Sequence, residues 1–113
     1  MSINGPEFSK SLKLNTEWQG TPEGEVMFDI VTACFKGCHG GTWPVADFIL
    51  NLYNSNRPVC LSLLCSQTNP ELFNLALNAL KIRRKNGEEP QEYFVDGDNV
   101  MKALCKLYHR DSE

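Results

Sequence analysis

Residues 69–87 read NPELFNLALNALKIRRKNG and combine the start, the apolar spacing and the end of one long helix. The Asn69 side chain can cap the first turn, and Pro70 suits the first helical position because it has no N–H to leave unpaired. Basic residues crowd the last turn, where cations interact favourably with the helix dipole, and Gly87 then ends the helix. The apolar residues between these ends predict a broad stripe that faces a core. They are Leu72, Phe73, Ala76, Leu77, Ala79, Leu80 and Ile82.

The same start, a capping residue followed closely by proline, occurs twice earlier in the chain. Thr21-Pro22 predicts a helix that stops at Lys36-Gly37, and its apolar residues follow three- and four-residue spacing. Thr42-Trp43-Pro44 predicts a second helix, which ends at residues 54–56. Three independent helix starts of one kind make a helical protein the expected class.

The remaining segments complete this picture. Residues 59–65 are almost continuously apolar and allow either a buried helical turn or a short strand; their helical neighbours favour the turn. Asp96 is a candidate cap for a last amphipathic helix, which reaches Tyr108. We therefore predict an all-α fold, a small orthogonal bundle of four main helices plus a short helical turn, with an extended N-terminal arm.

The length of 113 residues suits one domain with one modest core. Residues 1–20 contain few large apolar side chains and are predicted to form an arm or loop that Trp18 anchors. Residues 21–110 are expected to form the single helical domain, and residues 111–113 a solvated tail.

Composition narrows the classes of partner. The net charge of −3 provides no general attraction to nucleic acid or to an anionic membrane. No stretch approaches the roughly 18 apolar residues that a membrane span needs, and residues 1–14 lack the pattern of an export signal. We therefore expect a cytoplasmic protein without a membrane partner. Its five cysteines, an odd number, are expected to be free thiols.

Residues 45–54, VADFILNLYN, carry one resemblance. They resemble a core segment of a family of small uncharacterised helical bacterial proteins that are encoded by phages and plasmids. In that family a first helix and a loop of small residues precede a helix of this type, and an apolar connection and a longer helix follow. The resemblance extends in layout from Met27 to Tyr108 and implies an all-α fold and a mobile-element origin. It implies no activity.

A zinc site is the sharpest chemical alternative. Cys34, Cys38 and His39 place three candidate ligands within six residues, and zinc prefers four nitrogen or sulfur ligands. No two cysteines have the two-residue gap of zinc knuckles and ribbons. The apolar positions of Cys34, Cys60 and Cys105 favour packing in the core, so we expect no metal and no other cofactor.

Catalysis has weaker support. A nucleophilic Cys38 would need a base, and neither His39 nor His109 is placed for that role by any recognisable signature. Phosphate-binding glycine loops, zinc-protease motifs and serine-hydrolase motifs do not occur. We assign no catalytic residue and favour a non-enzymatic protein.

Candidate binding residues are of two kinds. The aromatic residues Trp43 and Tyr53 lie at helix ends, and aromatic side chains are enriched at protein interfaces. We therefore expect an accessory protein that binds another protein or itself. The basic run that contains Arg83, Arg84 and Lys85 supports an alternative, a nucleic-acid-binding regulator that contacts phosphates. A zinc-stabilised helical module is the remaining alternative.

Overall fold

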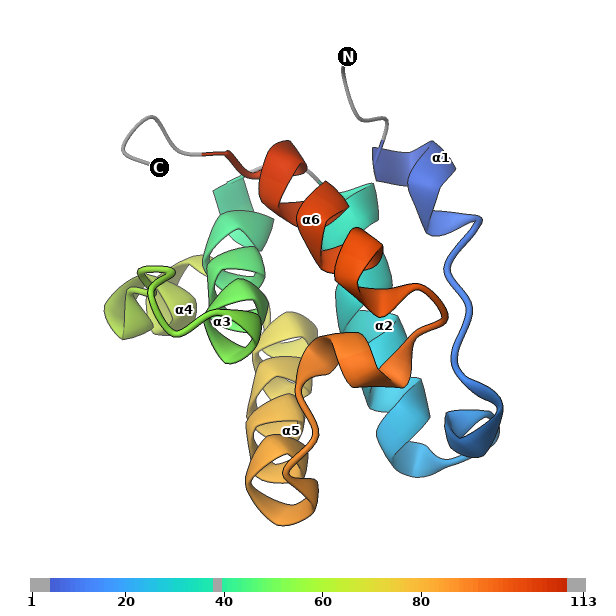
Figure 1. Ribbon diagram of the computed structural model, residues 1–113. Coiled ribbons are helices and arrows are strands. Elements are labelled where there is room, and N and C mark those ends of the chain that lie inside the picture. Colours follow the sequence, from blue (N-terminus) through green and yellow to red (C-terminus); the bar gives the residue numbers. More distant parts are fainter. Residues whose placement is uncertain (1–4, 38–39, 110–113) are drawn as a thin grey trace.

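The predicted all-α fold is confirmed. The computed structural model describes residues 5–37 and 40–109, and within these ranges the only β pairing is an isolated bridge between Leu14 and Phe94. The four main helices are α2 (Pro22–Lys36), α3 (Trp43–Tyr53), α5 (Pro70–Asn86) and α6 (Gly97–Leu107) (Figure 1). Shorter elements are α1 (Gly5–Ser9), η1 (Thr16–Trp18), η2 (Gly40–Thr42), α4 (Leu61–Gln67) and η3 (Pro90–Tyr93). The helical interpretation of residues 59–65 was therefore correct, because α4 begins at Leu61, but the turn is not buried as predicted, since Leu64 is the one buried residue of α4.

Two of the predicted helix starts are capped as their sequences indicate. The Thr21 hydroxyl accepts a hydrogen bond from the Gly24 N–H at 3.0 Å, and the Asn69 side chain accepts one from the Leu72 N–H at 2.8 Å. The third start differs. Thr42 precedes α3 without capping it, and its hydroxyl instead donates to the Gly37 carbonyl at the end of α2. Thr42 thus ties α3 to α2.

The start of α6 also differs from the prediction. Asp96 occupies the cap position with a left-handed backbone (φ 57°), and its carboxylate accepts hydrogen bonds from the Asn99 side chain at 3.0 Å. It makes no side-chain bond to a backbone N–H of the helix. Asp96 therefore contacts the first turn of α6 through the Asn99 side chain.

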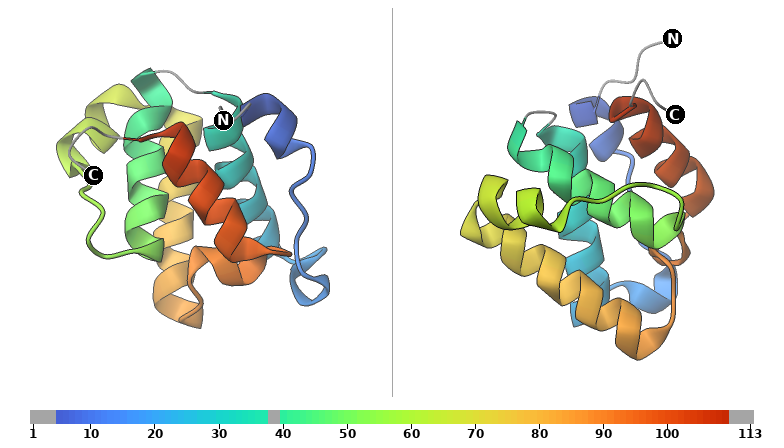
Figure 2. Two further views of the ribbon diagram at one scale, coloured as in Figure 1. Left: turned by 45° about the horizontal axis from the view of Figure 1, so that its top comes forward. Right: turned by 90° about the vertical axis from the view of Figure 1, so that its left-hand side faces the viewer.

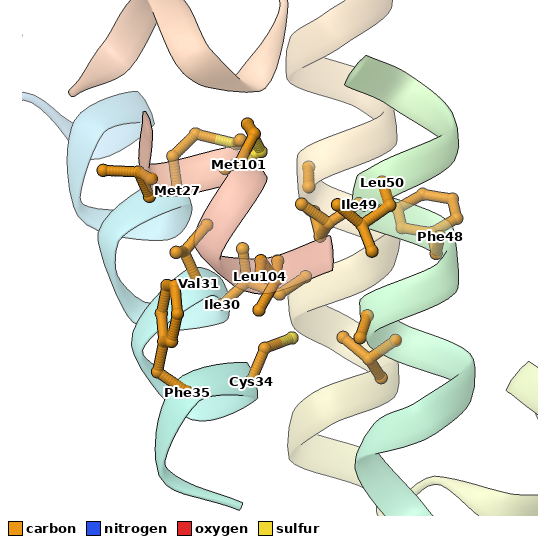
Figure 3. Close-up of a cluster of buried hydrophobic side chains, with 14 of the residues drawn as sticks. Met27, Ile30, Val31, Cys34, Phe35, Phe48, Ile49, Leu50, Met101 and Leu104 are labelled. Atoms are coloured by element: carbon orange, nitrogen blue, oxygen red, sulfur yellow. The ribbon is translucent and has the colours of Figure 1, made fainter. Parts of the chain in front are cut away.

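The core forms where α2 meets α3, α5 and α6 (Figure 2). Ile30, Val31 and Phe35 of α2 are fully buried (Figure 3), and Ile49 of α3 and Leu104 of α6 complete the centre of the cluster. Each of these residues falls on the face that the helical spacing predicts.

Residues 5–20 of the predicted N-terminal arm contain more helix than the sequence suggests. Its first turn forms α1, which packs on α2 and stacks Phe8 on Phe35, with ring centroids 4.8 Å apart. Further along, Trp18 packs on Tyr93 of η3 at 4.5 Å, as expected of an anchor. The Lys13 carbonyl accepts a hydrogen bond from the Val95 N–H at 2.8 Å. The arm is therefore held to both α2 and the segment before α6.

One prediction about burial was wrong. Leu77 and Leu80 belong to the apolar stripe of α5, yet they are 39% and 46% exposed. α5 contacts α2 and α3 with the part of the stripe where Ala76 and Ala79 are buried. The stripe is wider than the surface that these two neighbours cover.

The structure also bears on membrane insertion. Among residues 5–37 and 40–109, no helix has the length and apolar character of a membrane span.

Candidate functional site

Four leucines on two consecutive helices form the main exposed apolar feature of the described residues. Leu61 and Leu63 of α4 are 64% and 43% exposed, and Leu77 and Leu80 of α5 were described above. Only residues 68 and 69 separate the two helices, and both helices contact α3 (Figure 2). We call these four side chains the α4–α5 surface.

The charge around this surface differs from that of the whole chain. α4 has no charged residue, and α5 has one acidic residue, Glu71, in its first turn. Its other charged residues are the basic Lys81, Arg83, Arg84 and Lys85. A chain with a net charge of −3 therefore carries an excess of positive charge on the helix that exposes Leu77 and Leu80.

The structure brings two of the predicted binding residues, Tyr53 and Arg83, to one hollow of about 660 Å³. Residues 51–55 at the end of α3 form one wall, and Arg83 and Glu89 complete the lining. The hollow lies beside the basic end of α5, so it joins two sequence features that are 30 residues apart.

Hydrogen bonding distinguishes the two charged groups of the hollow. The Glu89 carboxylate accepts a hydrogen bond from the Gln91 side chain at 2.8 Å and takes part in the capping box of η3. Arg83 is half-buried, and its guanidinium has no hydrogen-bond or ion-pair partner among the described residues. The hollow therefore presents a free cation beside an engaged carboxylate.

The pKa of the Tyr53 phenol is raised in the hollow. Burial, and next the nearby Asp98 carboxylate, raise the pKa of the Tyr53 phenol above its usual value. At neutral pH the phenol is therefore a neutral hydrogen-bonding group on the rim of the hollow.

The other predicted binding residues lie elsewhere or are more exposed. Trp43 is half-buried and contacts Tyr108 edge to face, with ring centroids 4.9 Å apart, so it helps to close the core at the start of α3. Arg84 and Lys85 are exposed in the last turn of α5. Arg84 shares the outward face of α5 with Leu77, since they are two turns apart.

Of the three cysteines predicted to pack in the core, Cys34 does so, whereas Cys60 is exposed and Cys105 is half-buried. Cys34 is fully buried, and burial raises the pKa of its thiol to about 12. Cys60, just before α4, and Cys65, within α4, are exposed, and Cys105 is half-buried. The prediction that Cys60 packs in the core was therefore wrong. It relied on the apolar residues around Cys60, but α4 packs only one side on α3.

The zinc alternative rests on residues that the structure describes only in part. Cys38 and His39 lie outside the described residues. Burial raises the pKa of the Cys34 thiol and so favours its protonated form, whereas zinc binds the thiolate. Elsewhere in the described ranges, no group of three or more potential ligands comes together. Cys105 and His109 do line one hollow of about 500 Å³.

The sequence analysis missed a buried polar network. Asp47 of α3 is buried and pairs with Arg57 of the following loop. Arg57 also donates to the Tyr108 carbonyl at 2.8 Å, and the Tyr108 hydroxyl donates to the Cys34 carbonyl at 2.6 Å. These contacts join α2, α3 and the end of α6. An arginine in a polar loop gives no local signal of such burial.

Comparison with protein-family models, with curated proteins and with solved structures gave no match to this chain.

Proposed function

We propose that this chain is a small non-enzymatic accessory protein that acts by binding another protein through its α4–α5 surface. The exposure of Leu61, Leu63, Leu77 and Leu80 carries this proposal. Single exposed leucines are common on proteins, but several on adjacent elements are typical of interaction sites. Full burial of a leucine side chain stabilises by about 1.5–3 kcal/mol, so even partial burial of four would favour association.

The surroundings of the leucines support a specific interface. Tyrosine and arginine are enriched among the residues that dominate binding energy, and Tyr53 and Arg83 meet in the adjoining hollow. An apolar centre with a polar margin is the usual anatomy of a protein interface. Trp43, which packs against Tyr108, contributes less to this surface than the sequence suggested.

A nucleic-acid-binding regulator is the second candidate. The exposure of Arg84 and Lys85 beside one another favours it, because two adjacent cations can contact neighbouring phosphates. Phosphate contacts would leave the four leucines uncovered, so this candidate explains less of the surface. Binding to duplex DNA that falls steeply with salt and is lost in an Arg84→Glu/Lys85→Glu variant would support it.

A phage or plasmid origin is the third part of the proposal. It rests on the resemblance of residues 45–54, which form most of α3. Those residues are largely buried, so the resemblance concerns a core helix. The genes adjacent to this one would test the origin: phage, conjugation or defence genes would support it, and a conserved metabolic operon would count against it.

Site-specific cross-linking in the native cell tests the binding proposal. A photoreactive amino acid is placed at Leu63 or Leu80, and at Lys102 of α6 as a matched exposed control. We expect discrete protein adducts from both leucine positions and none from Lys102. Adducts should disappear when the other helix carries a glutamate at its exposed leucine, since one partner covers both helices.

The leucine variants must fold for this result to count. Because Leu77 and Leu80 are 39% and 46% exposed, their replacement by glutamate should lower the free energy of unfolding by about 1 kcal/mol each. Equal cross-linking at all three positions, or none at either leucine, would remove the proposed function.

A further inference from the structure

We infer that the partner presents an amphipathic helix whose apolar stripe covers the α4–α5 surface and whose acidic residues meet the basic end of α5, with one carboxylate on Arg83. This inference rests on the proposed function and adds the chemistry of the partner. It follows from the exposed leucines, from the charge of α5 and from the unpartnered Arg83 guanidinium among the described residues.

The first argument is the chemistry of the apolar part. Leu77 and Leu80 lie one turn apart on α5 and present one apolar strip to solvent. α4, which ends two residues before α5 begins, also exposes Leu61 and Leu63 and carries no charged side chain; these two leucines are two residues apart and project from different sides of the helix. A helix lying on such a surface offers leucine-like residues at three- and four-residue intervals, whereas a nucleic acid offers none.

The second argument is charge complementarity. The exposed cations Lys81, Arg84 and Lys85 follow the leucines along α5, and no acidic residue lies between Leu72 and Gly87. Complementary charge at an interface margin accelerates association and selects among partners. An acidic partner therefore fits this end of α5 better than a neutral or a basic one.

The third argument is the hollow beside Arg83. Arg83 is half-buried, and its guanidinium has no hydrogen-bond or ion-pair partner among the described residues. It lines the hollow together with Tyr53 and Glu89, and the Glu89 carboxylate already accepts a hydrogen bond from the Gln91 side chain. Arginine binds a carboxylate through two parallel hydrogen bonds. A glutamate or aspartate side chain of the partner would satisfy this cation and would fix the register of the bound helix.

A second copy of the chain fits less well. Each copy would bring the same basic helix end to the contact, with Glu71 as the one acidic residue of α5. A two-fold contact centred on Leu77 and Leu80 would run the two α5 helices antiparallel, so the basic end of each copy would lie against the first turns of the other, which offer Glu71 as their one carboxylate. Charge thus favours a different, acidic partner.

The test uses the full chain and a synthetic peptide. The peptide is an amphipathic helix of about 18 residues, close to the length of α5, with a leucine stripe flanked by glutamates. One matched peptide carries lysine at every glutamate position, and another carries the same residues without the stripe. Binding is measured by fluorescence anisotropy at two salt concentrations, and alkylation of the exposed Cys65 reports whether α4 is covered.

We expect the acidic peptide to bind at least about tenfold more tightly than either matched peptide, and to slow alkylation of Cys65. Arg83→Ala should weaken binding about tenfold or more, and Arg83→Lys should restore only part of it because lysine lacks the paired donors. The control Lys102→Ala on α6 should leave binding unchanged.

Several outcomes would overturn the inference. The first is equal affinity for the acidic and lysine peptides. The second is peptide binding that Arg83→Ala leaves unchanged. The third is displacement of the peptide by duplex DNA to the same extent in the unmodified chain and in Leu77→Glu/Leu80→Glu. Self-association that Leu77→Glu/Leu80→Glu abolishes would instead assign the surface to a second copy. If cross-links form at Leu63 and Leu80 while the peptide shows no charge preference, the proposed function stands and this inference alone fails.

Discussion

Arg57 Nη2 lies 2.7 Å from Asp47 Oδ1, and both side chains are only 3% exposed. Arg57 Nε also donates to the same oxygen at 3.1 Å, so one carboxylate oxygen receives two bonds from one guanidinium. The pair closes the loop after α3 against the end of α6, because Arg57 reaches the Tyr108 carbonyl as well. Removing one charge of this pair should therefore change the free energy of unfolding differently from replacing both residues by apolar ones.

Replacing Arg57 by alanine should lower the free energy of unfolding by about 3–5 kcal/mol, because it leaves a buried carboxylate without its counter-charge. Urea denaturation followed by circular dichroism measures the change. The double variant Asp47→Leu/Arg57→Met should be more stable than Arg57→Ala, since it removes both charges. A loss below 1 kcal/mol in Arg57→Ala would show that the pair is not buried as described.

Tyr108→Phe should destabilise the protein by about 1–3 kcal/mol. The lost hydroxyl donates to the Cys34 carbonyl at 2.6 Å and is 2.8 Å from the Thr42 hydroxyl, in a fully buried place. Tyr53→Phe is the control, because Tyr53 is more exposed and should cost less. Thermal unfolding of both variants checks the order, and a costlier Tyr53→Phe would contradict it.

Alkaline pH should unfold the protein partly through Cys34. Burial raises the pKa of this thiol from 9.0 to about 12, so the folded state favours the neutral thiol. The stabilisation is complete below pH 9.0 and is lost as the pH rises towards 12, at about 1.4 kcal/mol per pH unit. Cys34→Ala should reduce this slope in urea titrations under reducing conditions. A remaining slope above about pH 10 is expected, because burial raises the pKa of Tyr93 too.

Gly97→Ala should cost about 1–3 kcal/mol or more, because a Cβ there would overlap the Gln91 carbonyl, which packs against α6. Gly20→Ala provides the contrast. Its Cβ would meet nothing within 4 Å, but the backbone φ of 78° disfavours alanine, at a cost of about 1 kcal/mol. Equal stability of the two variants in urea denaturation would argue against the close approach at Gly97.

Thiol reactivity should separate the cysteines. Cys60 and Cys65 are exposed and should react rapidly with iodoacetamide at neutral pH, whereas buried Cys34 should react only on unfolding. Peptide-level mass spectrometry reads each site individually. Rapid modification of Cys34 in folded protein would contradict its burial.

The sequence by itself determined where the main helices begin and end. A cap, a proline and a glycine act through their own backbone and the next turn, so Thr21-Pro22, Asn69-Pro70 and Gly87 could be interpreted without knowing any neighbour. The helical spacing likewise identified the buried residues of α2, because a helix face that is apolar over its whole length packs against the core. Arg83 and Tyr53 were selected by residue type and position at helix ends.

Only the tertiary structure decided which faces remain uncovered and which polar groups meet. Leu77 and Leu80 are as apolar as buried leucines, and their exposure depends on how much of α5 its neighbours can cover. The burial of Arg57 depends on a carboxylate ten residues away and on the end of α6. Such contacts arise from packing between elements distant in the chain, which local preferences do not encode.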